Sequence, residues 1–481
     1  NFCLYLGAVH ACMQADSSRR PPPPRSCDTF VYVAGGGGPA ATVFGKNADR
    51  PSDEAHEVMH CPAASHAPGS MLRCTHIEIP QVERTHAVVL SKPAWMWGCE
   101  IGANACGVVG GNEAVSSLLA HELGEEPRLL GMDLLRLALE RGATARAAVG
   151  HLTSLLEEHG QGGACEEDGD WTYENGFLLA DAGEAFVVET AGTRHWAVER
   201  VPPGAGRNIS NGLSIRTGVE SCSAGLKELC VAKGWWDGEG PFDWKRSVGA
   251  GGRAHAKLDV RGRERAGADH LAAAAGRVSD GSLPAGDVAG WLGWMAGVLR
   301  DEESGAARWG ASGDGSSTHC PHHAPTPTPC QASASGLLTA SCRRARRSRG
   351  ARPGTGSGSQ RAPPGGAAAS CLACRLARGG GHTASHFFTA ASDPLVACYK
   401  RWTFGDPAAA AGDGLAGDGG SLALWRRWRS IDLAGRSVPE AMRRALLEIE
   451  AEAVSAAERG GASEFSGSVA RELELISSFA V

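Results

Sequence analysis

Hydrophobic and polar positions follow a period of two over many short stretches of this chain. Apolar and polar residues alternate from Cys27 to Val33, β-branched and aromatic types are enriched, and glycines at 35–38 end the run. This pattern predicts a β-strand. Other strand-like runs occur at residues 41–44, 75–79, 85–91, 107–112, 177–180, 185–189, 194–200 and 208–213.

Two segments in the first half instead show apolar residues at helical spacing. They predict helices at 129–140 and 144–159, where Gly142 fits the C′ position after the first and Thr144 the N-cap of the second. Later helical patterns lie at 288–303, 422–431 and 437–454, the last with a capping box of Ser437 and Glu440. Strands, then two helices, then strands again favour a layered α+β fold.

A chemical signal lies at the first predicted strand. The hairpin formed by residues 27–33 and 41–44 is expected to bring Lys46, Asn47 and Asp49 back beside Cys27. A thiol faced by a lysine, an amide and a carboxylate is a candidate nucleophile. The alternative is a small buried cysteine of the ordinary structural kind.

Several motifs around this cysteine occur together in one known family. They are Cys27-Asp28-Thr29-Phe30 and the segments 44–54, 77–97, 102–113, 130–140 and 155–163, followed by weaker ones at 235–240, 288–303, 336–341 and 386–404. In these motifs the chain resembles the secernins, within the dipeptidase and acylase group of N-terminal-nucleophile (Ntn) cysteine hydrolases. The resemblance implies a four-layer αββα Ntn-hydrolase sandwich.

The resemblance also implies that residues 1–26, which end in a polyproline stretch, are a leader or propeptide. Removal of the leader would expose the α-amine of Cys27. An α-amine has a pKa of about 7.7–8.0, so it can take the thiol proton directly or through a water. Self-cleavage between Ser26 and Cys27 and trimming by another protease are both open routes.

The roles of four further residues follow from the same resemblance. Asp49 would hold the α-ammonium of Cys27. Lys46 stands where the acylases carry arginine, so a bidentate contact is not expected, although its charge would lower the pKa of the thiol. Asn112 and Asn211 match the amides of the acylase oxyanion hole. The acylases also carry a late catalytic arginine, whose position in this sequence is left open.

Aromatic residues near the strands could form the substrate pocket. Trp95 and Trp97 lie in a turn after the 85–91 strand and are candidates for its wall, together with Asn47. Large aromatic residues beside strands also often belong to the core, which is the alternative for both tryptophans.

Composition narrows the partners and the compartment. The net charge of −6 gives no drive toward nucleic acid or anionic membranes. No apolar run approaches the roughly 20 residues of a membrane span. The 16 cysteines form no compact framework, which favours reduced thiols and a cytoplasmic location. Residues 2–13 are mildly apolar, so a remnant of a targeting segment is a second reading of the leader.

The chain is expected to divide into four parts. These are the leader (1–26), an Ntn-hydrolase-like core (27–303), a low-complexity insertion expected to be disordered (304–385), and a C-terminal part of the same domain with terminal helices (386–481). The insertion contains possible zinc ligands with no standard spacing: Cys320, His322, His323, Cys330, Cys371 and Cys374. A basic cluster at 343–349 has no interleaved aromatic residues, which favours a solvated tail. No metal and no cofactor is predicted.

Two classes of function fit these features. The first is a cysteine-type dipeptidase or exopeptidase acting on short peptides or other amides, with Cys27 as its N-terminal nucleophile. The second is a non-hydrolytic, secernin-like regulator of exocytosis on the same fold. A carbonyl-derived cap on the N-terminal amine, which would make Cys27 an electrophile, is a third possibility. The oligomeric state is open, and a homo-oligomer is one of the alternatives.

Overall fold

The computed structural model describes residues 27–33, 41–51, 54–124, 126–250, 260–284, 287–300, 367–377, 384–389, 397–404, 420–433, 438–458 and 465–479. The chain divides into two compact units. All described residues belong to one of them, which comprises residues 1–310 together with residues 364–481. The expected leader (1–26), residues 304–366 of the expected insertion and the Ser437 cap lie outside the described residues.

The first sheet carries the strand that follows Cys27. Among the described residues it has six strands, with antiparallel pairing between all neighbours. In order across the sheet they are β14 (Gly206–Ile209), β1 (Asp28–Val33), β2 (Ala41–Arg50), β16 (Ala367–Ala377), β17 (Ser385–Phe388) and β18 (Lys400–Trp402).

The second sheet has eight strands among the described residues. Their order is β15 (Val219–Cys222), β13 (His195–Val201), β12 (Ala185–Ala191), β11 (Glu174–Ala180), β10 (Val109–Val115), β9 (Ile101–Asn104), β8 (Val88–Pro93) and β3 (His56–Cys61). Two small ribbons accompany it, β4 (Ala64–Ser65) with β7 (Arg84–Thr85), and β5 (Met71–Arg73) with β6 (Glu78–Pro80).

Alternation along β1 separates two hydrophobic layers. Phe30 and Tyr32 belong to a cluster with helices α6 (Val260–Ser279), α7 (Val288–Arg300) and α10 (Glu440–Glu458). Val31 and Val33 belong to a different cluster, which is shared with the second sheet. Successive side chains of a strand point to opposite faces, so one side of the first sheet packs on helices and the other on the second sheet.

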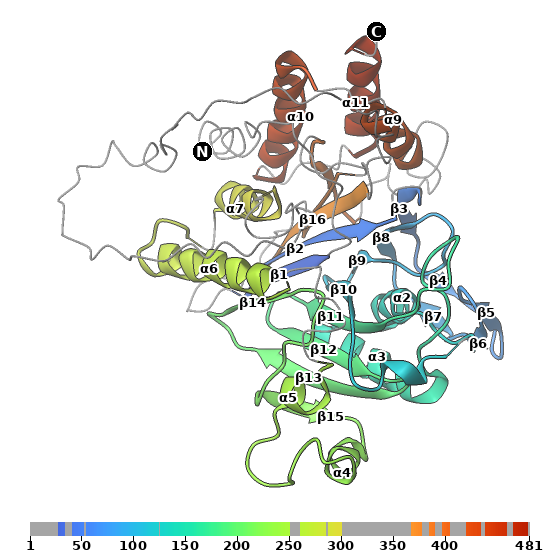
Figure 1. Ribbon diagram of the computed structural model, residues 1–481. Helices are drawn as coiled ribbons and strands as arrows, with labels where there is room; N and C mark the ends of the chain where they lie inside the picture. Colours follow the sequence, from blue (N-terminus) through green and yellow to red (C-terminus); the bar gives the residue numbers. More distant parts are fainter. Residues whose placement is uncertain are drawn as a thin grey trace, which may run out of the picture. The chain divides into compact units, whose positions relative to one another are not determined.

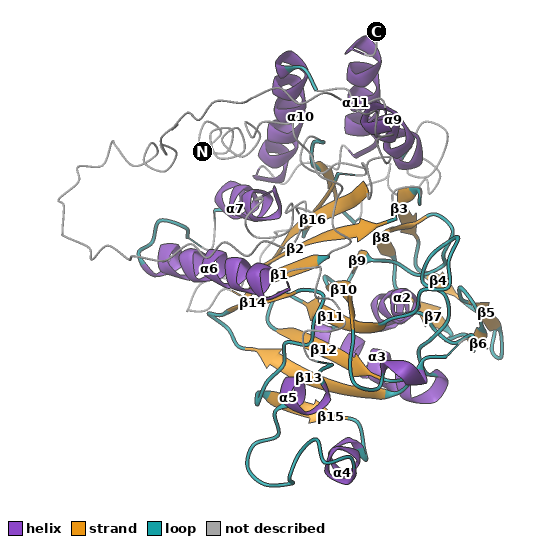
Figure 2. Cartoon of the chain, in the orientation of Figure 1, coloured by secondary structure: helices purple, strands orange, loops and turns teal. Residues whose placement is uncertain are grey.

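The second sheet also carries helices on one face. Phe177 and Val188 pack with the apolar residues of α2 (Gly131–Arg141) and α3 (Ala145–His159). Figure 1 shows α2 and α3 beside β10 to β13, and Figure 2 shows α6 and α7 beside β14, β1 and β2. The prediction of a mixed helix and sheet fold is therefore confirmed. No helix within the described ranges is long and apolar enough to cross a bilayer.

The remaining helices lie around these layers. They are η1 (Ala120–Glu122), α4 (Leu226–Ala232), α5 (Trp244–Val248), α9 (Ser421–Leu433) and α11 (Phe465–Phe479). Glu472 of α11 is completely buried and pairs with Lys400 of β18 at 2.5 Å, and it accepts a hydrogen bond from Trp428 of α9 at 2.8 Å. This ion pair ties the C-terminal helices to the first sheet.

Most predicted elements are present, with shifted ends. The strand at 27–33 and both helices are confirmed, and the Thr144 side chain accepts from the Ala147 nitrogen as an N-cap should. Gly142 follows the first helix but has a φ of −98°, so it is no left-handed cap. A Cβ there would lie 2.5 Å from the Ala148 backbone, and this close approach of the two helices accounts for the glycine.

The second strand of the hairpin differs more. Strand β2 runs on to Arg50, where the sequence pattern predicts a strand ending at residue 44, and it pairs Asp28 with Asn47 and Thr29 with Lys46. Lys46 therefore points to one face of the sheet, and Asn47 and Asp49 point to the other. Strand β16, inside the expected insertion, pairs with β2 along its whole length. The sequence pattern indicated neither α6 nor α11.

Candidate active site

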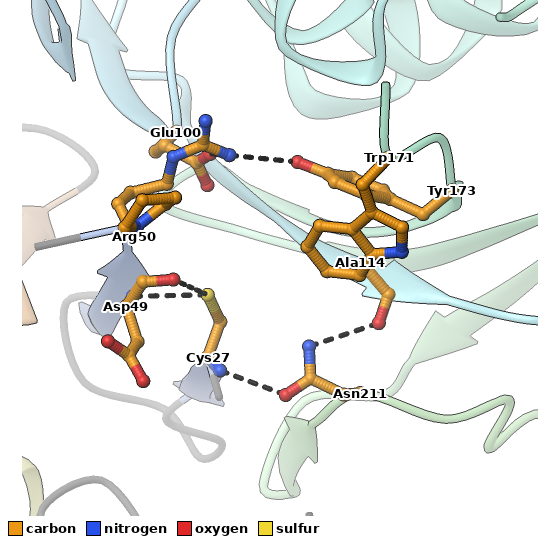
Figure 3. A pocket seen from close by; sticks show the side chains of 9 residues that line it. Cys27, Asp49, Arg50, Glu100, Ala114, Trp171, Tyr173 and Asn211 are labelled. Atoms are coloured by element: carbon orange, nitrogen blue, oxygen red, sulfur yellow. Dashed lines mark hydrogen bonds and ion pairs between the residues drawn. The ribbon is translucent and has the colours of Figure 1, made fainter. Parts of the chain in front are cut away.

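A cavity of about 380 Å³, partly open to solvent, lies at the start of β1. Its lining residues come from both sheets and from the loops that precede β9 and β11. They are Cys27, Asp49, Arg50, Pro51, Glu100, Ala114, Trp171, Tyr173 and Asn211 (Figure 3).

The Cys27 thiol is held against the backbone of β2. The Asp49 amide donates to Cys27 Sγ at 3.2 Å, and the thiol donates to the Asp49 carbonyl at 3.8 Å. Only 7% of Cys27 is exposed. Burial raises the pKa of this thiol well above its ordinary value, the positive charge of Lys46 lowers it in part, and Glu113 and Glu100 raise it again. The thiol is therefore protonated at neutral pH and needs a base before it can react.

The backbone nitrogen of Cys27 is held by Asn211. It donates to Asn211 Oδ1 at 2.9 Å, while Asn211 Nδ2 donates to the Ala114 carbonyl of β10 at 3.0 Å. These two contacts fix which end of the amide faces Cys27 (Figure 3). The sequence placed Asn211 at the site, and the structure brings it there.

Arg263 of α6 completes this arrangement, and the sequence analysis did not identify it. Its Nη2 donates to Asn211 Oδ1 at 3.0 Å, and its Nη1 donates to the Cys27 carbonyl at 3.0 Å and to Asp28 Oδ2 at 2.9 Å. Only 2% of Arg263 is exposed. Gly267 lets α6 approach the sheet, because a Cβ there would lie 2.4 Å from Asn208 Nδ2 of β14.

Lys46 lies on the other face of the sheet, between the two sheets. Its Nζ is 3.2 Å from Glu113 Oε2, and neither side chain is exposed. Burial lowers the pKa of Lys46, but the nearby Cys27, Glu113 and Glu100 outweigh burial and raise it. Lys46 therefore stays charged beside the thiol.

The predicted hairpin was expected to bring Asp49 and Asn47 beside Cys27, but the side chains of both residues point elsewhere. Asp49 contacts the thiol through its backbone, its carboxylate points away from the sulfur in Figure 3, and the Cys27 nitrogen donates to Asn211. Asn47 does not line the cavity: its Nδ2 donates to the Leu299 carbonyl of α7 at 2.7 Å. The reason is strand alternation, which turns residues 47 and 49 toward the helical side.

Three other predicted residues also lie away from the cavity. Asn112 faces α2 and contacts Asn175 at 3.1 Å, because its neighbours on β10 are the ones that point toward Lys46. Trp97 lies under the Arg136 guanidinium at 4.1 Å, and Trp95 packs on an apolar cluster next to the site.

The aromatic wall of the cavity is Trp171 and Tyr173 instead, with ring centroids 4.9 Å apart. Arg50 also lines the cavity, and the quoted motif at 44–54 already contained it. It pairs with Glu54 at 2.7 Å and with Glu100 at 3.3 Å, and donates to Tyr173 Oη at 3.2 Å. This network joins the two sheets across the site.

No group of three or more histidine, cysteine, aspartate or glutamate side chains suited to a metal ion occurs in the part of the chain that the structure describes. Four of the possible zinc ligands named above, between positions 320 and 330, lie outside that part. For Cys371 and Cys374 the structure describes the backbone alone. The basic cluster at 343–349 also lies outside it.

Residues 79–249 match the model of peptidase family C69. The matched segment is little more than a third of the 481-residue chain. The match confirms the resemblance to the secernin and dipeptidase group. The C69 match contains Glu100, Glu113 and Asn211, whereas Cys27 and Arg263 lie outside it.

Two curated relatives are dipeptidases. The chain is 37% identical over 97 residues to a dipeptidase of Bifidobacterium longum, covering 19% of this chain and 16% of that protein. It is 30% identical over 145 residues to the probable dipeptidase B of Lactococcus lactis, covering 27% and 28%. The chain thus matches less than a third of the length of either relative.

Similar solved structures include two variants of the conjugated bile acid hydrolase of Clostridium perfringens. They are 12% and 10% identical, each with a TM-score of 0.27, and cover 43% and 58% of this chain and 57% and 74% of theirs. At this TM-score the likeness adds nothing to the argument.

Proposed function

We propose that this protein is a cysteine-type Ntn hydrolase that cleaves amide bonds in short peptides, with Cys27 as the N-terminal nucleophile. One observation carries the proposal: the thiol of Cys27 lines the cavity while its own nitrogen is held by Asn211 at 2.9 Å. A nucleophile and its base would then belong to one residue. The layering of helices, sheet, sheet and helices agrees with an αββα sandwich, which forms part of the proposal.

The base appears when the leader is removed. As long as residue 26 is attached, the Cys27 nitrogen is an amide and cannot accept a proton. Cleavage before Cys27 frees an α-amine, which is partly neutral at pH 7 and takes the thiol proton. This matters because burial keeps the pKa of the thiol high.

The reaction then follows two steps. The thiolate attacks the substrate carbonyl carbon, a C–S bond forms, and the amine leaves with the proton that the α-ammonium returns. Water then attacks the thioester, the α-amine accepts its proton, and the acid and the free thiol are released.

Two groups would support the transition state. An amide nitrogen carries two hydrogens, so Asn211 Nδ2 can donate to the Ala114 carbonyl and to the oxyanion at once. Arg263 would act as the late arginine that the resemblance implies, by holding Asn211 and the Cys27 carbonyl in place. Asn112 would need another conformation to serve as a second donor.

The cavity favours small zwitterionic substrates. The space of about 380 Å³ includes a part that is open to solvent, so the enclosed part has room for a small substrate only. Its wall contains one arginine, Arg50, and two acidic residues, Asp49 and Glu100. The guanidinium is shared by Glu54 and Glu100, so acidic groups outnumber cations at the wall, which suits the α-ammonium of a dipeptide.

The test begins with the mass of the mature N-terminus, followed by amino acid release from a panel of dipeptides. We expect a chain that starts at Cys27 and is active, and no activity in Cys27→Ala. Cys230→Ala is the matched control, because Cys230 is a completely buried thiol far along the chain on α4. A correctly processed protein that is inert toward all dipeptides and amides would refute the proposal and favour the regulatory alternative.

A further inference from the structure

The buried pair of Lys46 and Glu113 shows how a charge is kept in the interior next to the thiol. Lys46 on β2 and Thr29 on β1 are direct partners across the strands, and both face β10 of the second sheet. Glu113 meets both of them: Thr29 Oγ1 donates to one carboxylate oxygen and Lys46 Nζ to the other at 3.2 Å. A completely buried ammonium is costly unless it is paired and hydrogen-bonded, and this carboxylate supplies the pair.

The backbone of β10 is shaped for this contact. Gly111 lies two residues before Glu113 and faces the same way. A Cβ at Gly111 would lie 2.4 Å from Lys46 Cδ and 3.4 Å from Thr29 Oγ1. Only a residue without a side chain lets the lysine stem pass at this point. The glycine and the glutamate thus form one receptor for Lys46.

We propose that Glu113 is a positioning residue: its carboxylate, held between Thr29 and Lys46, keeps the Lys46 ammonium in the interior beside the Cys27 thiol. The inference rests on the proposed function, because it assumes that Cys27 is the reactive thiol. Glu113 does not line the cavity and makes no described contact with the thiol, so it acts by holding Lys46 and through its own negative charge.

The two charges act on the thiol with opposite signs. Lys46 stabilises the thiolate, while an ionised Glu113 destabilises it and offsets the lysine. Burial raises the pKa of Glu113 to about 8, against the lowering effect of Lys46 and Thr29, so this offset is complete only above pH 8. Two further charges act on these groups. Glu100 acts on both Cys27 and Lys46, and Asp28 acts on Glu113. Because these groups are coupled, the apparent pKa values belong to the assembly. Opposite responses to the loss of each partner are a signature that a purely structural ion pair would not give.

The test measures thiol reactivity, so it does not depend on hydrolysis. The rate of iodoacetamide labelling of Cys27 is followed by mass spectrometry at pH 9 in the processed protein, where the rate is proportional to the thiolate fraction because burial holds the pKa of the thiol well above its ordinary value. In Glu113→Gln the glutamine can still accept from Lys46 but carries no charge, so we expect the rate to rise about tenfold, which is one unit in the pKa of the thiol. In Lys46→Met we expect the rate to fall by a similar factor. Thr29→Val, which is isosteric, should raise the rate by less, because loss of that hydrogen bond favours the neutral form of Glu113.

The matched control is Glu57→Gln. Glu57 and Lys92 form another buried pair, at 2.9 Å, between β3 and β8 of the second sheet, and neither is among the largest influences on the pKa of Cys27. This variant should leave the labelling rate unchanged. The inference is overturned if neither Glu113→Gln nor Thr29→Val changes the rate, or if the control changes it equally. If the shifts occur in a protein that hydrolyses nothing, the inference stands and the proposed function fails.

Discussion

Replacing Arg263 by lysine tests whether the guanidinium of α6 positions the nucleophile. Among the contacts of the arginine, three hold the site: Nη1 donates to the Cys27 carbonyl and to Asp28, and Nη2 donates to Asn211. A lysine can keep the ion pair with Asp28, but it has no second nitrogen in a fixed fork for Asn211. Arg263→Lys therefore removes the Asn211 contact and leaves no buried carboxylate unpaired.

The size of the effect follows from this one hydrogen bond. A hydrogen bond from a charged donor is worth about 1.5–3 kcal/mol. If about 2 kcal/mol of positioning is lost in the transition state, the rate falls about 30-fold, because 1.36 kcal/mol is tenfold. We expect the loss in kcat and little change in KM, since Arg263 does not line the cavity. Arg263→Met should be worse, because it leaves Asp28 buried without its cation at a cost of about 3–5 kcal/mol.

The assay is steady-state hydrolysis of a good dipeptide, with thermal unfolding measured beside it. Arg136→Lys is the control: Arg136 on α2 is also largely buried, pairs with Glu140 at 2.8 Å and bonds the Trp97 carbonyl at 2.7 Å, away from the cavity. If Arg263→Lys loses no more activity than this control, Arg263 does not position Asn211 and the reasoning is wrong.

Three further predictions address selectivity, packing and pH. Glu100→Gln should lower kcat/KM for dipeptides by about tenfold or more while sparing N-acetylated dipeptides, and an equal loss for both would contradict ammonium recognition. Gly267→Ala should lower activity and the melting temperature together, because its Cβ would lie 2.4 Å from Asn208 Nδ2 and push α6 away from β14, whereas Gly276→Ala on the same helix, where the space is open, should do neither. Burial lowers the pKa of His386 to about 3, so its stabilisation is complete above pH 6.5 and is lost as pH falls toward 3; His386→Met should flatten the melting temperature between pH 7 and 5.

The sequence predicted the local elements of the site better than their contacts. The strand from Cys27 to Val33 and the N-cap at Thr144 depend on neighbouring residues, and both are present. The length of β2 was missed because Lys46 and Asn47 look like loop residues. They lie in a strand since each polar group is bound from another element, the lysine by Glu113 and the amide by the Leu299 carbonyl. Such pairing across the fold leaves no local periodicity.

The arginine of the site was missed for a related reason. Helix α6 is rich in alanine, glycine and arginine and has no clear apolar stripe, so its sequence resembles that of a solvated segment. It packs through few large side chains, among them Leu271, and approaches the sheet closely at Gly206 and Gly267. A helix that is held by close backbone approach shows no hydrophobic pattern in the sequence, and nothing in the sequence distinguishes Arg263 from the other arginines of α6.

Alternation along one strand therefore accounts for the way charge is arranged around Cys27. On one face of β1, Asp28 fixes Arg263, which holds Asn211 and so the Cys27 nitrogen. On the other face, Thr29 fixes Glu113 and so Lys46. Asp28 and Thr29 are consecutive residues of β1. They thus anchor the two cations of the site, Arg263 near the Cys27 nitrogen and Lys46 near its thiol. The two networks share no hydrogen bond among the contacts described above, but the charge of Asp28 acts on Glu113. Changes in Asp28 and Thr29 should therefore depart from additivity in their effect on rate, and strict additivity in the double variant would show that the two faces are independent.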